Sequence, residues 1–343
     1  MRILVTGGAG YVGSILVPML IERGYEVRVV DSGMFGTDHV PAEAELILGD
    51  VLEFEEEWLA EVDAVIHLAG LSNDPMAAFS PKLNYILNAG SPAIVAQATK
   101  EAGIHRFVFA STCSVYGLSD TFGVGEDHET LPSYPYGISK LMAERALACL
   151  TDDDFRPIVL RKGTVVGWSP RMRFDLVTNT MIKTALTQKN IVVNNPSLWR
   201  PLLDVTDAAR AYIRALDADL SVTGIFNVAG ENYTIGRLAD IVASTLREFD
   251  VDVPLEIQHR QDVRSYRVST EKALQVLDFR SSVTMRETVR TVIREIQKNE
   301  LVDLDSPRYH NIDQMKINLA NGSLIFSESG LSDTTATSAT RAS

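Results

Sequence analysis

The chain has 343 residues, of which 45% are hydrophobic and 22% are charged, and its formal net charge is −13. The apolar fraction excludes a wholly disordered chain, and the length suggests one large or two medium-sized domains. An acidic surface repels a phosphate backbone, so we expect no nucleic-acid partner. A few arginines in a cleft can still bind one small anionic ligand.

Two cysteines, Cys113 and Cys149, are too few for a disulfide framework and match no zinc motif, so we predict no metal site. No apolar run reaches the ~18 residues of a membrane span. The first residues pass directly into a strand and a glycine-rich turn, which leaves no room for a signal peptide. We therefore expect a cytoplasmic protein with no membrane partner.

Short apolar or β-branched runs alternate with longer amphipathic segments through the first half of the chain. Such runs are typical of strands buried on both faces. Their alternation with helical segments predicts right-handed βαβ units and an α/β fold with a doubly wound parallel sheet (Rossmann). The predicted strands are residues 3–5, 27–30, 46–48, 64–67, 107–110 and 158–160.

The second half of the chain is less regular and suggests a smaller α+β region. We expect a helix from about Phe174 and another that Asp207 opens over residues 208–216. Short strands at 191–193 and 202–205 and a helix after Thr234 complete this part. Toward its end the chain becomes rich in Ser and Thr and poor in large apolar side chains, so it cannot offset the entropy of ordering. We expect residues 316–343 to form a mobile tail.

A glycine-rich turn follows the first predicted strand and opens a helix. Gly7, Gly10 and Gly13 are spaced three residues apart, and Gly8 also fits the dinucleotide fingerprint in place of the first. Glycines let the backbone approach a pyrophosphate, and the exposed N–H groups of the helix start bind it. Asp31 ends the second predicted strand, where a carboxylate accepts hydrogen bonds from a ribose 2′-hydroxyl and repels a 2′-phosphate, which favours NAD over NADP. The alternative is an aspartate that only stabilises a turn.

Tyr136 and Lys140 are four residues apart at the start of a predicted helix, and hence on one face of it. A phenol with a pKa near ~10 is a poor base at neutral pH. A nearby lysine ammonium and a positive nicotinamide ring favour the phenolate and lower that pKa. Ser111 and Thr112 follow the strand at 107–110, so their hydroxyl groups lie at the sheet edge where ligands bind in parallel α/β proteins.

With these motifs in this order, residues 1 to about 300 resemble the extended short-chain dehydrogenase/reductases, specifically the nucleotide-sugar epimerase/dehydratase branch. The resemblance implies NAD as cofactor. It also implies Tyr136 as catalytic base, Lys140 as its activator and ribose ligand, and Thr112 as the third triad member, with Ser111 as the alternative. The cofactor-binding residues that it implies are Gly7, Gly10, Tyr11, Val12, Gly13, Asp31, Asp50, Val51, Leu68, Ala69, Gly70, Asn88, Ser111, Tyr136 and Lys140.

The resemblance further implies a nucleotide-diphosphate sugar as substrate. Asn179 resembles the asparagine that meets the diphosphate, and Arg200 resembles a diphosphate-binding arginine. Residues 260–264 resemble the family's late Arg–Asp motif without its usual glycine, so Arg260 and Arg264 are alternatives. The substrate-binding residues implied in this way are Asn73, Thr112, Ser114, Thr164, Asn179, Arg200, Arg260 and Arg264.

Three departures from the family pattern narrow the expected reaction. The 4,6-dehydratases carry Asp-Glu directly after the triad threonine, where this chain has Cys113 and Ser114, so elimination has no obvious acid. The 3,5-epimerases and fucose-type epimerase-reductases place a cysteine where this chain has Ser114, so their chemistry is disfavoured as well. Galactose-type 4-epimerases have a substrate-contacting asparagine where this chain has Thr164, so the sugar contact differs.

We therefore expect NAD-dependent epimerisation at C4 of a nucleotide-linked sugar through a transient 4-keto intermediate. A 4-ketoreductase or other sugar oxidoreductase is the first alternative, a 4,6-dehydratase the second, and a non-catalytic dinucleotide sensor the last. By the same resemblance, residues 1–170 and 203–229 form the NAD-binding domain, whereas 171–202 and 230–315 form the nucleotide-sugar-binding domain. Segments 88–102 and 136–150 correspond to helices that pair across a two-fold axis in the family, so we expect a homodimer.

Overall fold

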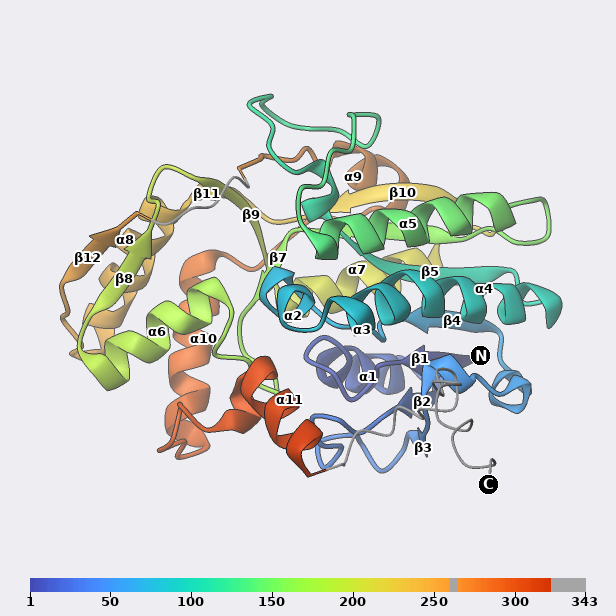
Figure 1. Ribbon diagram of the computed structural model, residues 1–343, viewed down its shortest axis with the longest axis horizontal. Coiled ribbons are helices and arrows are strands. Elements are labelled where there is room, and N and C mark those ends of the chain that lie inside the picture. The colour runs from blue at the N-terminus through green and yellow to red at the C-terminus, as the bar shows by residue number, and fades with distance from the viewer. Residues whose placement is uncertain (260–264, 322–343) are drawn as a thin grey trace, which may run out of the picture.

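A seven-stranded sheet dominates the computed structural model, which describes residues 1–259 and 265–321 (Figure 1). The strand order is β10-β6-β5-β4-β1-β2-β3, and all neighbouring strands are parallel. The predicted doubly wound fold is confirmed. The strands are β1 (Arg2–Thr6), β2 (Glu26–Asp31), β3 (Glu45–Leu48), β4 (Ala64–His67), β5 (Arg106–Thr112), β6 (Ile158–Lys162) and β10 (Gly224–Val228).

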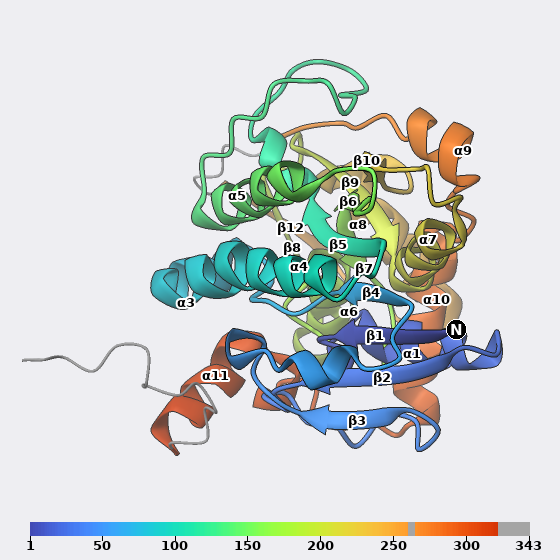
Figure 2. The ribbon, with the colours of Figure 1, turned by 90° about the vertical axis from the view of Figure 1, so that its right-hand side faces the viewer.

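Helices cover both faces of this sheet (Figure 2). Ile3 and Val5 of β1 pack in one core cluster with α1 (Gly13–Glu22) and α7 (Val205–Asp217), whereas Leu4 packs in another with α4 and α5. All three side chains are fully buried. Because side chains alternate along a strand, both faces of β1 must be apolar. The helices on the second face are α4 (Ser91–Glu101) and α5 (Pro135–Leu150).

A second, smaller domain lies beside the sheet domain, at the left in Figure 1. It contains a three-stranded sheet of order β11-β9-β7 and a parallel pair, β12-β8. Its helices enclose a separate apolar core. The elements are β7 (Thr164–Val166), α6 (Val177–Gln188), β8 (Ile191–Asn194), β9 (Trp199–Asp204), β11 (Asn232–Thr234), α8 (Ile235–Leu246), β12 (Leu255–Gln258) and α10 (Met285–Lys298).

Short elements connect these layers and carry the loops that reach the carboxyl ends of the strands. β1 pairs with both β2 and β4, so the winding direction reverses between β1 and β4, where ligands bind in open α/β sheets. The short elements are η1 (Val51–Glu53), η2 (Glu56–Leu59), α2 (Asp74–Phe79), α3 (Pro81–Tyr85), a π-helical turn η3 (Ile86–Gly90), η4 (Cys113–Tyr116), η5 (Arg247–Phe249), α9 (Glu271–Leu277), η6 (Pro307–Tyr309) and α11 (Asn311–Ala320).

Two predicted boundaries in the second half are wrong. Phe174 does not start a helix, because its ring is fully buried in the second core against Tyr309, and α6 begins only at Val177. Asp207 does not open α7, because Asp204 caps that helix by accepting a hydrogen bond from the Thr206 N–H. Val205, which we placed in a strand, is the first residue of α7.

The mobile tail that we expected from residue 316 is wrong for residues 316–320, which lie in α11. The adjacent Met315 is fully buried in a core cluster, and the Asn318 side-chain amide donates a hydrogen bond of 2.8 Å to the Met34 carbonyl. These contacts offset the cost of ordering the helix. Residues 322–343 lie outside the described residues. Across 1–259 and 265–321, none of the helices combines the length and apolar character needed to cross a bilayer.

Candidate active site

A cavity of about 690 Å³ lies at the carboxyl ends of β1, β2, β4 and β5 and continues into the second domain. This volume is within the usual range for small-molecule sites. Its walls include most of the residues that the sequence singled out, although these are scattered through the chain. Those lining the cavity are Gly7, Gly10, Tyr11, Val12, Gly13, Asp31, Asp50, Val51, Leu68, Ala69, Gly70, Asn73, Ser111, Thr112, Ser114, Tyr136, Lys140, Thr164 and Arg200.

The glycine-rich turn between β1 and α1 forms one wall of the cavity. Gly7 has φ of +73°, and a Cβ there would lie 2.6 Å from the Ala69 amide nitrogen. A Cβ at Gly13 would overlap the backbone of Gly8. No side chain caps the N-terminus of α1 at Val12. The Ser14 and Ile15 N–H groups already donate to the Gly10 and Val12 carbonyls, so an anion would approach the backbone N–H groups that precede them. The turn therefore has the shape and polarity that a pyrophosphate requires.

Asp31 ends β2 and faces the same wall. Its Oδ2 accepts a hydrogen bond from the Ala9 N–H at 3.0 Å, and its Oδ1 accepts one from the Gly33 N–H at 2.9 Å. Burial raises the pKa of Asp31, and these two N–H groups oppose that rise. A carboxylate oxygen has further lone pairs, so Asp31 can also accept hydrogen bonds from a ligand hydroxyl.

Tyr136 and Lys140 lie in the first turns of α5 and both line the cavity. Burial raises the pKa of Tyr136, and the Asp74 carboxylate raises it further, whereas Arg173 and a hydrogen bond from the Asn73 N–H lower it. Burial and the nearby Lys162 ammonium lower the pKa of Lys140 to about 7. The Lys140 Nζ lies 4.9 Å from the centre of the Phe109 ring.

In the protein without ligands the pKa of Tyr136 is therefore raised, and the lowering that we expect with a bound nicotinamide ring stays a prediction. Burial penalises the phenolate, and Lys140 is itself only partly charged near neutral pH, since its own pKa falls to about 7. A positive charge in the cavity would favour the Tyr136 phenolate and so lower the pKa of Tyr136, but by like-charge repulsion it would lower the pKa of Lys140 further.

Ser111 and Thr112 end β5 with different partners. The Ser111 hydroxyl donates a short hydrogen bond to the buried Glu144 carboxylate. The Thr112 hydroxyl oxygen accepts a hydrogen bond of 3.1 Å from the Ser114 N–H and still has a proton to donate. Thr112 therefore has the hydroxyl that can act on a ligand, whereas Ser111 supports the wall behind it.

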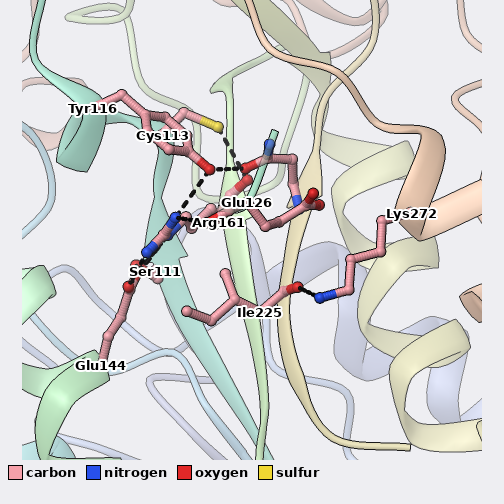
Figure 3. Close-up of polar contacts among 9 residues, drawn as sticks. Ser111, Cys113, Tyr116, Glu126, Glu144, Arg161, Ile225 and Lys272 are labelled. Carbon is pink, nitrogen blue, oxygen red and sulfur yellow. Dashed lines mark hydrogen bonds and ion pairs between the residues drawn. The ribbon is translucent and has the colours of Figure 1, made fainter. Parts of the chain in front are cut away.

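Behind this wall lies a buried ion pair between Arg161 of β6 and Glu144 of α5, shown in Figure 3. The Arg161 Nη2 lies 2.6 Å from Glu144 Oε2, and both side chains are less than 5% exposed. Arg161 also donates to the Tyr116 hydroxyl at 2.9 Å, and the Cys113 thiol donates to the Arg161 carbonyl. Burial raises the pKa of Cys113, so this thiol is a structural group and not a proton-transfer group.

Two predicted contact residues do not reach the cavity. Asn88 is fully buried beneath the loop after β4 and donates to the Leu71 carbonyl and to Asn84. Asn179 is fully buried as well, and its amide holds the backbone of Gly167 from both sides. Both asparagines shape loops that line the cavity. Arg260 and Arg264 lie outside the described residues.

The sequence analysis missed several charged groups that line the cavity. Arg173 forms a two-pronged ion pair with Asp175, at 2.9 and 2.6 Å, and Arg171 lies beside it in the same loop after β7. Lys162, at the end of β6, has its pKa lowered to about 8 by burial. The available signal was the alternation of arginines with buried apolar residues from Arg171 to Phe174. We expected a helix from about Phe174 and assigned no role to the arginines before it.

These residues fit a dinucleotide and not a metal ion. The uncapped helix start and the glycine turn match a pyrophosphate, and the Asp31 carboxylate matches a ribose hydroxyl pair. Within residues 1–259 and 265–321, no group of three or more His, Cys, Asp or Glu side chains is placed to hold a metal ion.

Known proteins resemble this chain in sequence and in fold. The model of the NAD dependent epimerase/dehydratase family matches residues 3–229. The UDP-glucose 4-epimerase of Corynebacterium glutamicum is 27% identical over 317 residues, which cover 86% of this chain and 94% of that relative. The UDP-glucose 4-epimerase of Bacillus subtilis is 30% identical over 254 residues, which cover 65% of this chain and 75% of that relative.

Among solved structures, MoeE5 in complex with UDP-glucuronic acid and NAD is 27% identical to this chain. It superposes with a TM-score of 0.77 over 87% of this chain and 100% of that chain. The family match includes the glycine turn, Asp31, β5 and the Tyr136–Lys140 pair. The chain belongs to the NAD dependent epimerase/dehydratase family, and its cofactor is NAD.

Proposed function

We propose that the protein is an NAD-dependent epimerase that inverts C4 of a UDP-linked hexose. One observation carries this proposal: the cavity joins the NAD-type turn to Tyr136, Lys140 and Thr112, and it continues into the second domain. The sheet domain then binds NAD and the second domain binds the nucleotide sugar. The relatives that act on or bind UDP-sugars support uridine as the nucleotide.

The chain's own residues supply binding, orientation and proton transfer in this reaction. NAD, when bound, accepts a hydride from the sugar and returns it. The Tyr136 phenolate takes the proton of the C4 hydroxyl, and the Thr112 hydroxyl donates a hydrogen bond to the same oxygen. The resulting 4-keto sugar turns about its diphosphate, which Arg200 holds at the other end of the cavity. Tyr136 then returns its proton to the opposite epimer.

Purification without added nucleotide tests this proposal directly. An epimerase regenerates its cofactor in every cycle, so we expect NAD to copurify and UDP-glucose to equilibrate with UDP-galactose without added NADH. UDP-glucuronic acid and UDP-xylose form the rest of the substrate panel. A strict need for stoichiometric NADH or NADPH would instead identify a ketoreductase.

The cofactor preference provides a separate prediction about Asp31. Replacing Asp31 by Ser together with Ser32→Arg, both of which line the cavity, removes the ribose acceptor and adds a phosphate-binding group. We expect the ratio of the NAD and NADP dissociation constants to shift toward NADP by about 10- to 100-fold. Asp31→Asn, which keeps an acceptor oxygen, is the control and should shift less. An unchanged ratio in the double variant would contradict the assignment.

We also propose that the protein is a homodimer that pairs through α4 and α5. These helices pack side by side (Figure 2), and Ile94 and Met142 on them are 45% and 49% exposed. Introducing Arg at both positions should halve the mass measured by light scattering. Leu220→Arg, at an exposed site on a loop of the sheet domain, should leave the mass unchanged. A wild-type monomer would overturn this proposal.

We further propose a cytoplasmic location. Both cysteines are free thiols, Cys113 buried and Cys149 exposed, which suits a reducing compartment. Cell fractionation tests this location, and recovery in an oxidising compartment would contradict it.

A further inference from the structure

Arg171 is a buried cation, and part of its guanidinium can still donate hydrogen bonds. Its side chain is only 4% exposed, and its Nη2 donates to the Asn311 Oδ1 at 2.6 Å. Its Nε and Nη1 have no hydrogen-bond partner among the described residues. Burial and the neighbouring Arg173 lower the pKa of Arg171 to about 9. A guanidinium held in this way is unfavourable unless an anion occupies the space that it faces.

The surroundings of Arg171 place that anion in the cofactor half of the cavity. Its guanidinium stacks on the Phe35 ring, 4.1 Å from the ring centre, and Phe35 lies in the loop that follows Asp31. Arg171 also interacts electrostatically with Asp175, which is paired with Arg173, and with Asp31 and Tyr11, which belong to the cofactor wall. All of these residues line the cavity.

Other cations in the cavity have different partners or locations. Arg173 is matched by Asp175 and donates to the Ser72 hydroxyl at 2.7 Å. Arg200 lies on β9, and we assign it to the substrate diphosphate. The Asp31 carboxylate would repel a ribose 2′-phosphate placed beside Arg171. The anion that Arg171 can still bind is the pyrophosphate that the start of α1 accommodates.

We propose that Arg171 binds the pyrophosphate of NAD from the second-domain side, opposite the glycine-rich turn. Asn311 of α11 orients the guanidinium, because it accepts from Arg171 and donates to the Ser72 hydroxyl. The same helix reaches the Met34 carbonyl through Asn318. The C-terminal helix and the loop after β7 thus close the cofactor site and favour retention of NAD between turnovers. This inference rests on NAD as cofactor and not on the identity of the sugar.

Arg171→Met tests the proposal through binding. In the full-length protein freed of nucleotide, calorimetry should give dissociation constants for NAD and ADP-ribose that are about 10- to 100-fold weaker, because a hydrogen-bonded charge is lost. Adenosine, which has no phosphate, should bind unchanged. The purified variant should also retain less NAD than wild type. Arg308→Met is the control. It removes an equal charge from an exposed position just before α11 and should leave both dissociation constants unchanged.

Stability separates this role from a purely structural one. Because the unliganded protein holds Arg171 charged at a cost, Arg171→Met should not lower its melting temperature. Arg171→Lys keeps the charge without the planar fork and should give intermediate affinities for NAD and ADP-ribose.

Four outcomes would overturn the proposal. An equal loss of affinity for adenosine, or a lowered melting temperature, would make Arg171 a structural residue. Weaker binding of UDP with unchanged binding of NAD would assign it to the substrate. A wild-type preference for NADP that Arg171→Met abolishes would assign it to a 2′-phosphate.

Discussion

Replacing Tyr136 by Phe is expected to lower kcat by at least about 10³-fold, while the protein still binds NAD. The phenol is the group that we place on the C4 hydroxyl, and Phe removes only its oxygen. The measurement is the rate of conversion between UDP-glucose and UDP-galactose, together with the dissociation constant for NAD. Tyr85→Phe, at an exposed position on α3, is the matched control and should retain full activity.

Full activity of the Tyr136→Phe variant would contradict the mechanism. A wild-type protein that binds NAD but converts no nucleotide sugar would favour a dinucleotide sensor. Thr112→Val gives a graded comparison. Because this hydroxyl donates one hydrogen bond to the reacting oxygen, its loss should cost about 10- to 100-fold, less than the loss of the base.

Arg161→Met is expected to destabilise the protein by about 3–5 kcal/mol, because it leaves the Glu144 carboxylate buried without its partner. Glu144 also accepts a hydrogen bond from the Ser111 hydroxyl (Figure 3). The effect should therefore extend to the end of β5, where Thr112 lies. The measurement is denaturant unfolding of the nucleotide-free protein. The double variant Arg161→Met with Glu144→Leu removes both charges and should recover most of the lost stability.

Arg156→Met provides the control for the same residue type near the surface. Its ion pair with Asp153 is exposed, with the Asp153 side chain 100% accessible, so we expect a loss of at most about 1 kcal/mol. If Arg161→Met cost no more than Arg156→Met, the buried pair would not be the support that we describe.

Much of the fold could be predicted because strands buried on both faces leave a clear pattern. β1 is the clearest case, since Ile3 and Val5 enter one core and Leu4 enters the other, which makes the whole run apolar. The glycine turn and the Tyr136–Lys140 pair could also be predicted, because local geometry fixes the spacing of their residues. Once the chain forms a parallel sheet, these motifs meet at one edge of it.

The residues that the sequence did not reveal depend on tertiary contacts. Asn179 resembles a ligand-binding asparagine by its place in the chain. In the folded protein it is buried, and its amide forms hydrogen bonds with the Gly167 backbone instead. Arg171 and Asn311 are 140 residues apart and gain a shared role only when α11 packs across the cofactor half. The Tyr136 pKa illustrates the same limit, because the Asp74 carboxylate at the start of α2 raises it from a distant part of the chain.

Asp74 suggests the main alternative to C4 epimerisation, which is dehydration. A carboxylate near Tyr136 could remove a proton from a carbon next to a 4-keto group. UDP-glucose labelled with deuterium at C4, incubated in ordinary water with added unlabelled NADH, separates the two reactions. The proposed epimerase returns the same hydride to C4, so NMR should show UDP-galactose that keeps its deuterium at C4. Loss of the C4 label to the added cofactor pool would contradict epimerisation by retained NAD. So would a dehydrated product, or hydrogen from solvent appearing at C3 or C5 when the reaction is repeated in D₂O.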